Sequence, residues 1–428
     1  MRKPKWFVVF ALLMSLSLFA AACADDDDNG DAGGGDGADA DTVCSEDEFG
    51  CVEIAEGDPI VLGTLMVISG ENAQLGQDSQ NGAVLGADYV DGSFDGEAGE
   101  VLGHPIDFEH QDEGCAAEGG QAGAQRLVAD LDRVVSVIGT SCSSAALGVA
   151  DQILSDEGVV LMSPSNTSPD LAGPDHQPFY FRTAHNDLIQ GGAAARFVAE
   201  ELGLTTAATI HDGSTYADGL QQAFADAFTE AGGTITAQEA VQVGQKDMKP
   251  VLTQIAGTEP EFLFYPVFIP EGGAITAQSR EIAELDGVAL GGADGMLSPD
   301  FVAAAGAENA EGVYLSGPDL EFAGSFYQDE FLPAYEEQFG KTTSVFHAHS
   351  FDAVGIVLDA IEEVAIDDGG TLFIPRTALK DAIGSTSGYE GIVGELTCDT
   401  NGDCNPGATM SVSQVKGGEF ETVWRSSE

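Results

Sequence analysis

The sequence predicts a two-lobed α/β fold in which each lobe is a doubly wound parallel sheet covered by helices on both faces. From residue 58 onward, short apolar runs that are typical of buried strands alternate with segments of helical periodicity. The alternation starts again after residue 182, which indicates a second lobe. With 428 residues, 43% of them hydrophobic, the chain is long enough for two cores.

The first run of alternation begins with a strand and ends with a helix whose cap is Asn186 or Asp187. We expect strands at 60–68, 105–111, 134–138, 159–162 and 179–182. We expect helices at 77–90, 116–131, 144–156 and 187–202. Apolar strands joined by helices are the pattern of a parallel sheet that is buried on both faces.

The second run repeats this pattern and is followed by a tail of different character. Its expected strands are 207–211, 234–240, 261–265, 288–292 and 312–315, and its expected helices are 215–231, 248–256, 272–285 and 299–305. The tail has expected helices at 325–339 and 351–364 and strand-like segments at 389–396, 409–415 and 419–424. Two such lobes create a cleft at the carboxyl ends of their strands, where ligands of open α/β sheets bind.

Residues 1–22 predict a secretory signal peptide. Three of the first five residues are basic, and the segment 6–22 contains only Ser15 and Ser17 as polar residues. It ends in three alanines before Cys23, which resembles a bacterial lipobox, in which the cysteine is lipidated; an ordinary signal with an incidental cysteine is the alternative. We therefore expect an extracytoplasmic protein that is anchored to the cell membrane by a lipidated Cys23.

The chain is strongly acidic. Its 15 Lys and Arg residues against 72 Asp and Glu residues give a net charge of −57, which excludes nucleic-acid binding through a basic surface. A saline habitat and an acidic lineage bias both explain this charge. Residues 24–41 consist only of Ala, Asp, Asn and Gly, which cannot form a core, so we expect residues 23–57 to be an acidic disordered tether.

Six cysteines remain after Cys23, and an exported protein can form disulfides from them. Six cysteines allow 15 pairings. The spacing favours two local loops, Cys44–Cys51 and Cys398–Cys404. Cys115 and Cys142 then remain for each other.

The sequence contains no recognisable catalytic or metal motif: it lacks GxSxG, HExxH, the P-loop and CxxC. His347 and His349 are two residues apart, so we expect them on a solvated surface and not in a metal site. The segment 399–403 lacks the glutamate that closes a calcium loop, which favours a tight turn. We expect no cofactor, no metal and no enzyme activity.

Two hydroxyl-rich segments follow neighbouring strands of the first lobe. They are 138–144 (Ile-Gly-Thr-Ser-Cys-Ser-Ser) and 163–169 (Ser-Pro-Ser-Asn-Thr-Ser-Pro). Hydroxyls and backbone N–H groups at a helix start can bind a small anion such as a carboxylate. Ordinary helix capping by Ser and Thr is the alternative.

These segments are part of a resemblance to the leucine/isoleucine/valine-binding proteins of branched-chain amino-acid ABC transporters. Further matching segments, in the same order, are 156–164 (Asp-Glu-Gly-Val-Val-Leu-Met-Ser-Pro), 181–184 (Phe-Arg-Thr-Ala), 211–219 (His-Asp-Gly-Ser-Thr-Tyr-Ala-Asp-Gly), 246–247 (Lys-Asp) and 310–312 (Ala-Glu-Gly). The resemblance implies a type I periplasmic-binding fold with two Rossmann-like lobes and three hinge crossings. It also implies that residues 58–183 with 319–388 form the first lobe and residues 185–316 with 390–428 the second.

The resemblance also implies a set of ligand-binding residues. The ligand carboxylate would bind Ser143, Thr167 and the backbone at Ser165, and Tyr216 would approach from the second lobe. Asp294 stands where the family has a glutamate that binds the ammonium group. The side-chain pocket would be formed by Leu75, where the family often has an aromatic residue, Phe268 and Ile269. Cys115 and Cys142 match the family's disulfide.

The function implied by the resemblance is a monomeric substrate-binding lipoprotein that delivers branched-chain or other apolar amino acids to a membrane permease. A short amide, urea or a polar amino acid is an alternative ligand. A ligand-sensing domain is an alternative role, although the chain shows no fused effector. A hydrolase that uses Ser143 or Ser165 is disfavoured because the sequence shows no base to activate either serine.

Overall fold

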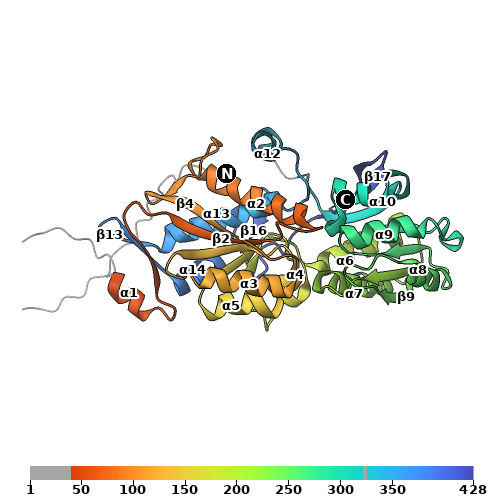
Figure 1. The fold of residues 1–428 in the computed structure, drawn as a ribbon, viewed down its shortest axis with the longest axis horizontal. Helices are drawn as coiled ribbons and strands as arrows, with labels where there is room; N and C mark the ends of the chain where they lie inside the picture. The colour runs from red at the N-terminus through yellow and green to blue at the C-terminus, as the bar shows by residue number, and fades with distance from the viewer. Residues whose placement is uncertain (1–39, 322–324, 428) are drawn as a thin grey trace, which may run out of the picture.

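Two α/β lobes lie side by side along the long axis of the molecule (Figure 1). The computed structural model describes residues 40–321 and 325–427. The predicted signal peptide, Cys23 and the tether up to residue 39 lie outside the described residues. Within these ranges, no helix has both the length and the apolar character that a membrane crossing requires.

The first lobe is built on a six-stranded sheet. Its order is β3 (Glu100–Val101), β4 (His104–Asp112), β2 (Ile60–Met66), β5 (Val134–Gly139), β6 (Val160–Ser163) and β7 (Tyr180–Arg182). All neighbouring strands in this sheet are parallel, except that the short β3 runs antiparallel to β4. Every residue of β2, β5 and β6 is buried, as the apolar runs predict for a doubly wound sheet.

Helices cover both faces of this sheet. One face packs against α2 (Ala73–Asp88) and α13 (His347–Val364), and the other packs against α3 (Ala117–Val128) and α5 (Asp151–Asp156). The helices α2 and α13 approach each other closely because Gly82 has no side chain. A Cβ atom at Gly82 would lie 2.0 Å from the carbonyl oxygen of His347. The C-terminal part of the chain thereby supplies a core helix of the first lobe.

The second lobe is built on a seven-stranded sheet. Its order is β18 (Glu419–Arg425), β17 (Met410–Lys416), β12 (Tyr314–Pro318), β11 (Ala289–Gly292), β10 (Phe262–Phe264), β8 (Thr206–His211) and β9 (Thr234–Ala240). Its helices are α6 (Asp187–Arg196), α7 (Thr215–Glu230), α8 (Lys249–Ala256), α9 (Ile269–Ser279) and α10 (Pro299–Ala305). The antiparallel β17 and β18 come from the tail of the chain, which therefore pairs with the second sheet.

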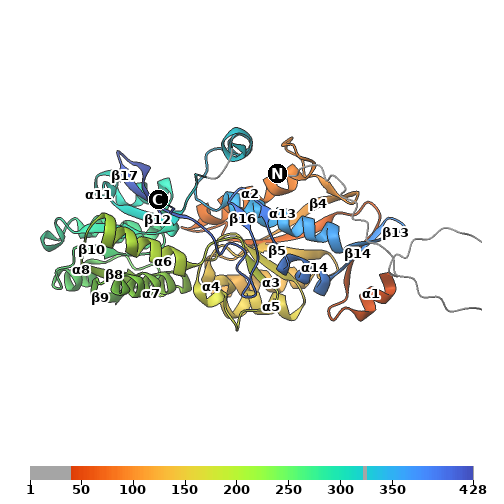
Figure 2. The ribbon, with the colours of Figure 1, turned by 180° about the vertical axis from the view of Figure 1, so that it is seen from behind.

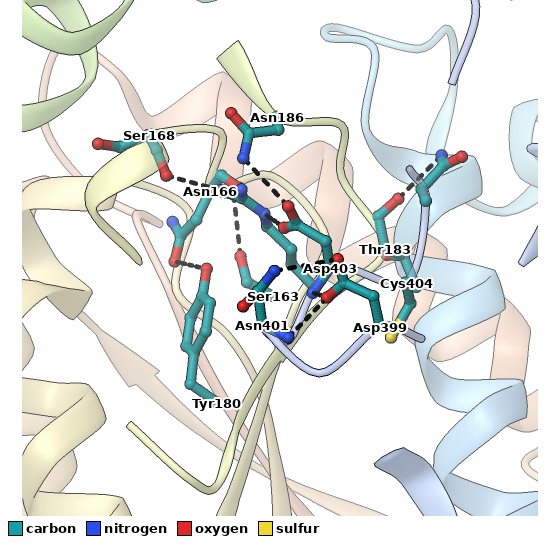
Figure 3. A network of polar contacts seen from close by, with 12 residues as sticks. Ser163, Asn166, Ser168, Tyr180, Thr183, Asn186, Asp399, Asn401, Asp403 and Cys404 are labelled. Carbon is teal, nitrogen blue, oxygen red and sulfur yellow. Dashed lines mark hydrogen bonds and ion pairs between the residues drawn. The ribbon is translucent and has the colours of Figure 1, made fainter. Parts of the chain in front are cut away.

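The chain passes between the lobes three times: after β7, after β12 and before β17. Buried Arg182 ties the first and third crossings together, since its Nε donates to Asp403. Its Nη1 donates to the carbonyls of Asn166 (3.1 Å) and Ser168 (2.7 Å) in the loop after β6. Figure 3 shows how these polar groups converge, with Asn186 bonded to the second oxygen of Asp403 (3.0 Å).

The expectation of a disordered tether as far as residue 57 is wrong for residues 40–57. This segment forms α1 (Ala40–Glu46) and β1 (Cys51–Ile54), which pairs with β14 (Thr371–Pro375) in a three-stranded sheet with β13 (Ile366–Asp368). These elements lie at the end of the first lobe that is farthest from the second lobe (Figure 2). The alternating Val52 and Ile54 are buried in the core of the first lobe, and the Cys44–Cys51 disulfide closes the segment. Apolar burial and the disulfide therefore outweigh the acidic composition.

Two further expectations are corrected in the tail. We expected the second lobe to resume at residue 390, but Leu396 and Cys404 lie in the core of the first lobe, so the third crossing follows Cys404. The segment expected as one strand at 389–396 is a hairpin of β15 (Tyr389–Glu390) and β16 (Glu395–Leu396). The helix α14 (Arg376–Gly384) and the strands β13 and β14 were not anticipated.

His347 and His349 do not lie on a solvated surface, as the sequence led us to expect, but are buried in the first lobe. The Nδ1 of His347 is 2.8 Å from Asp78 Oδ2, and its Nε2 is 2.7 Å from the hydroxyl of Tyr327. Burial would raise the pKa of Asp78, but the charge and hydrogen bonds of His347 lower it. Burial lowers the pKa of His349 to about 3, so this ring is neutral. His347 joins α2 to α13 and serves the fold.

Candidate functional site

The residues that the sequence singles out converge on a cavity between the two lobes. Its empty volume is about 230 Å³, which suits a small molecule. The lining residues are Leu75, Ser141, Cys142, Ser143, Ser165, Tyr216, Phe268, Asp294, Gly295 and Phe346. Most of them follow the carboxyl ends of parallel strands, namely β5, β6, β8, β10 and β11. This is the expected position of a ligand site in α/β sheets.

The wall from the first lobe is made of serine hydroxyls held by neighbouring backbone groups. Ser165 donates its hydroxyl to the carbonyl of Ser141 (3.0 Å), and the hydroxyl of Ser141 accepts the N–H of Val67 (3.1 Å). The hydroxyl of Ser143 accepts the N–H of Ser168 (3.4 Å). These bonds join the loops after β5 and β6 into one unit. The O–H of Ser165 is thereby used within the wall, whereas Ser143 only accepts in these bonds, so the O–H of Ser143 suits a carboxylate or another small acceptor.

A disulfide fixes the same wall. All three predicted pairings are present: Cys44–Cys51, Cys115–Cys142 and Cys398–Cys404. Cys142 lines the cavity directly before Ser143, and its N–H donates to Glu113 Oε1 (3.2 Å). The Cys115–Cys142 bond therefore ties the hydroxyl wall to the loop that follows β4.

Removing this disulfide should destabilise the first lobe. The bond closes a loop of 27 residues, for which the chain-entropy argument gives about 3.5 kcal/mol. We expect the double variant Cys115→Ser/Cys142→Ser to lose this amount in a denaturant titration. The variant Cys398→Ser/Cys404→Ser opens a loop of only 6 residues and should lose less. An equal loss in both variants would contradict the loop-length argument.

The wall from the second lobe is acidic and centres on Asp294. Its Oδ1 accepts hydrogen bonds from Gln190 Nε2 (2.7 Å) and from the hydroxyl of Tyr216 (3.1 Å). That hydroxyl accepts the N–H of Gly295 (3.1 Å), which fixes the direction of its own proton. Asp294 Oδ2 accepts no hydrogen bond from another residue in the described part of the chain. One oxygen of this buried carboxylate thus remains available to a ligand.

Burial raises the pKa of Asp294 to about 6, while the hydrogen bonds from Gln190 and Tyr216 oppose the shift. The carboxylate is therefore ionised at neutral pH but lacks a full complement of partners. Asp187 at the start of α6 is also buried, and burial together with the charge of Asp294 raises its pKa well above the usual range. The ionised carboxylate of Asp294 therefore places a negative charge at the cavity, which favours a positively charged group of a ligand.

The remaining lining is apolar. Leu75 comes from α2, Phe268 precedes α9, and Phe346 precedes α13. The rings of Phe268 and Tyr216 have their centroids 5.1 Å apart. These side chains supply apolar lining, against which an aliphatic group can pack.

Six of the eight predicted ligand residues line this cavity: Leu75, Ser143, Ser165, Tyr216, Phe268 and Asp294. Thr167 is buried behind the wall, where its carbonyl accepts the N–H of Asp187 (2.9 Å). Ile269 is buried in the core of the second lobe. Sequence reasoning missed Ser141 and Phe346. The hydroxyl segment contained a signal for Ser141, whereas Phe346 stands just before a helix that we expected to begin later.

A larger cavity, with about 1260 Å³ of empty volume, lies within the first lobe between α2, α13, η7 (Tyr327–Phe331) and the β15–β16 hairpin. None of the predicted site residues lines it. Burial raises the pKa of Asp352 in its wall to about 7, but both oxygens accept backbone N–H groups, from Ile392 and Val393 (2.9 Å each). This acid holds the hairpin, so we place the functional site in the cavity between the lobes.

Comparisons with known proteins agree with this architecture. A family model described as "Periplasmic binding protein" matches residues 59–419. The leucine-, isoleucine-, valine-, threonine- and alanine-binding protein of Pseudomonas aeruginosa is 26% identical over 340 residues, covering 78% of this chain and 84% of the relative.

Two solved structures are similar in fold. A leucine-binding protein from Thermotoga maritima has a TM-score of 0.74 at 23% identity, covering 86% of this chain and 98% of the other. A branched-chain amino acid transporter substrate-binding protein from Streptococcus pneumoniae, solved in complex with isoleucine, has a TM-score of 0.72 at 25% identity, covering 86% and 99%. The two-lobed fold predicted from the sequence is confirmed.

Proposed function

The chain belongs to the periplasmic binding protein family, and from this premise we propose that it captures an apolar α-amino acid such as leucine, isoleucine or valine between its lobes. Proteins of this family bind substrates for ABC transporters outside the cytoplasm and are not enzymes. In our proposal the closed protein, acting as a monomer, delivers its ligand to the membrane permease of an importer. A lipid on Cys23 would hold it at the membrane.

One observation carries the proposed ligand class: the carboxylate of Asp294 and the hydroxyls of Ser143 and Ser165 line the same small cavity from opposite lobes. A zwitterion loses its hydration when it is buried, so each of its charges needs a partner in the site. Hydrogen bonds to charged groups contribute about 1.5–3 kcal/mol each. The acid on one wall and the O–H of Ser143 on the other therefore fit the ammonium and carboxylate groups of an amino acid.

The apolar residues of the lining favour a ligand with an uncharged side chain. Leu75, Phe268 and Phe346 offer no hydrogen-bonding side-chain group to a polar ligand. Burying an aliphatic side chain against them contributes about 1.5–3 kcal/mol.

The raised pKa of Asp294 supports one alternative ligand class. Below pH 6 its carboxyl is protonated and can donate a hydrogen bond to a carbonyl oxygen. A neutral short amide or urea would then satisfy the site without an ammonium group. We keep this as the second candidate, with the same transport role.

Calorimetric titration distinguishes these ligands. We expect leucine, isoleucine or valine to bind the purified protein with micromolar or tighter affinity at pH 7.5, and acetamide and urea to show no heat of binding. Saturable binding of an amide, with none of the three amino acids, would replace the proposed ligand by the alternative.

The affinity for leucine should fall in acid. The ligand ammonium binds only the ionised form of Asp294, whose pKa is about 6 in the ligand-free protein. Affinity should be constant above about pH 7 and fall about tenfold for each pH unit below 6. Titrations between pH 5 and pH 8 test this, and an affinity that rises in acid would contradict an ammonium contact at Asp294.

A further inference from the structure

Gln190 is a fully buried amide on α6 that holds the ligand-facing acid. Its Nε2 lies 2.7 Å from Asp294 Oδ1 and 3.2 Å from both the carbonyl and the hydroxyl oxygen of Ser316 in β12. An amide nitrogen carries two hydrogens, so one serves Asp294 and the other serves Ser316. Both hydrogens of the Gln190 amide are therefore donated in hydrogen bonds, and the amide has a single orientation.

The other end of the amide reaches the first crossing between the lobes. Gln190 Oε1 can only accept, and its partner is Nε2 of His185. Burial lowers the pKa of His185 to about 4, so the ring is neutral and carries its proton on Nε2. The His185 ring also stacks on Phe346, with the centroids 6.2 Å apart, and Phe346 lines the ligand cavity.

We propose that Gln190 is a positioning residue for ligand capture: it fixes the carboxylate of Asp294 through Oδ1, leaves Oδ2 for the ligand, and links that carboxylate to the first crossing through His185. This inference rests on the proposed function, because it assigns Asp294 to the ligand ammonium. It explains why a glutamine, which can donate and accept at once, stands between an acid and a neutral histidine.

Three titratable groups surround Asp294. Tyr216 approaches from α7 and donates to it, Asp187 at the start of α6 is a second buried carboxyl whose pKa is raised by burial and by Asp294, and His185 acts through Gln190. Both burial and the charge of Asp294 raise the pKa of Tyr216, so Tyr216 remains a donor. Of the two groups that donate to Oδ1, Gln190 makes the shorter hydrogen bond.

The variant Gln190→Met tests this role, since methionine fills a similar volume and forms no such hydrogen bonds. In the ligand-free protein we expect carbon-13 NMR of the carboxyl groups to show the pKa of Asp294 raised by about one unit. Because leucine binds only the ionised form of Asp294, its binding should weaken about fivefold at pH 6 and hardly at all at pH 8. Gln221→Met is the control: Gln221 is also buried, on α7, but bonds only the carbonyl of Glu239 (3.4 Å).

A structural role alone would lower the melting temperature of Gln190→Met and leave the titration of Asp294 unchanged, and that result would overturn the proposal. If Gln190→Met does not fold, Gln190→Glu keeps the size and polarity, and its added negative charge should raise the pKa of Asp294 further. The NMR titration needs no ligand. A wild-type protein that does not bind leucine would therefore refute the proposed function, while the effect of Gln190 would still be decided.

Discussion

The variant Asp294→Asn should lose leucine binding and at the same time make the ligand-free protein more stable. Removing the partner of a buried charge costs about 3–5 kcal/mol, so affinity should fall on the order of 100-fold or more. The gain in stability follows from the raised pKa. Between pH 4 and pH 6 the unfolded carboxyl releases its proton while the folded one keeps it, so stability falls as the pH rises.

At neutral pH the shift from 3.8 to about 6 corresponds to roughly 3 kcal/mol, which the uncharged asparagine avoids. The gain should be present at pH 7–8 and vanish below pH 4. Asp88→Asn is a matched control, because Asp88 is buried in the first lobe and accepts the N–H groups of Asp95 (3.0 Å) and Gly96 (3.1 Å). It should lose stability and keep leucine binding. Unchanged leucine affinity in Asp294→Asn would exclude the ammonium contact.

The variant Arg182→Met should cause a large loss of stability. Arg182 is fully buried and bonds Asp403 and the carbonyls of Asn166 and Ser168. Methionine would leave Asp403 without its cation and would remove the hydrogen bonds that Arg182 donates to two carbonyls. Losing one partner of a buried pair costs about 3–5 kcal/mol. Urea denaturation measures this loss.

Two further variants test whether the loss of stability comes from leaving one partner of a buried ion pair alone. Arg133→Met removes an exposed ion pair with Asp130 and should cost less than about 1 kcal/mol. The double variant Arg182→Met/Asp403→Leu removes both charges and should recover part of the loss. If Arg182→Met were as mild as Arg133→Met, the link between the first and third crossings would not support the fold.

Buried strands and the two-lobe division could be predicted because each strand is a continuous apolar run and the alternation restarts after Arg182. The ordered structure of residues 40–57 could not be predicted, because it depends on pairing with β14, more than 300 positions away in the sequence. The histidines of α13 were misjudged for the same reason. The partner of His347 is Asp78 on α2, and spacing within one helix does not reveal a contact between helices.

The residues of the candidate site also fall into two groups: those that the sequence indicated and those that it did not. Ser143, Tyr216 and Asp294 follow strands and stand within recognisable segments, so the sequence located them. Thr167 belongs to the same hydroxyl segment as Ser165, but the loop turns it behind the wall, toward Asp187. Gln190 lies on α6 and contacts Asp294, 104 positions later, through a single hydrogen bond. Such a contact is set by tertiary packing and leaves no local signal.

A crystal structure of the protein grown with leucine tests the central claim most directly. We predict leucine between the lobes, with its ammonium within hydrogen-bond distance of Asp294 Oδ2, its carboxylate at the hydroxyl of Ser143, and its side chain against Leu75 and Phe268. Leucine bound in the opposite direction, with its carboxylate toward Asp294, or bound outside this cavity, would contradict the account.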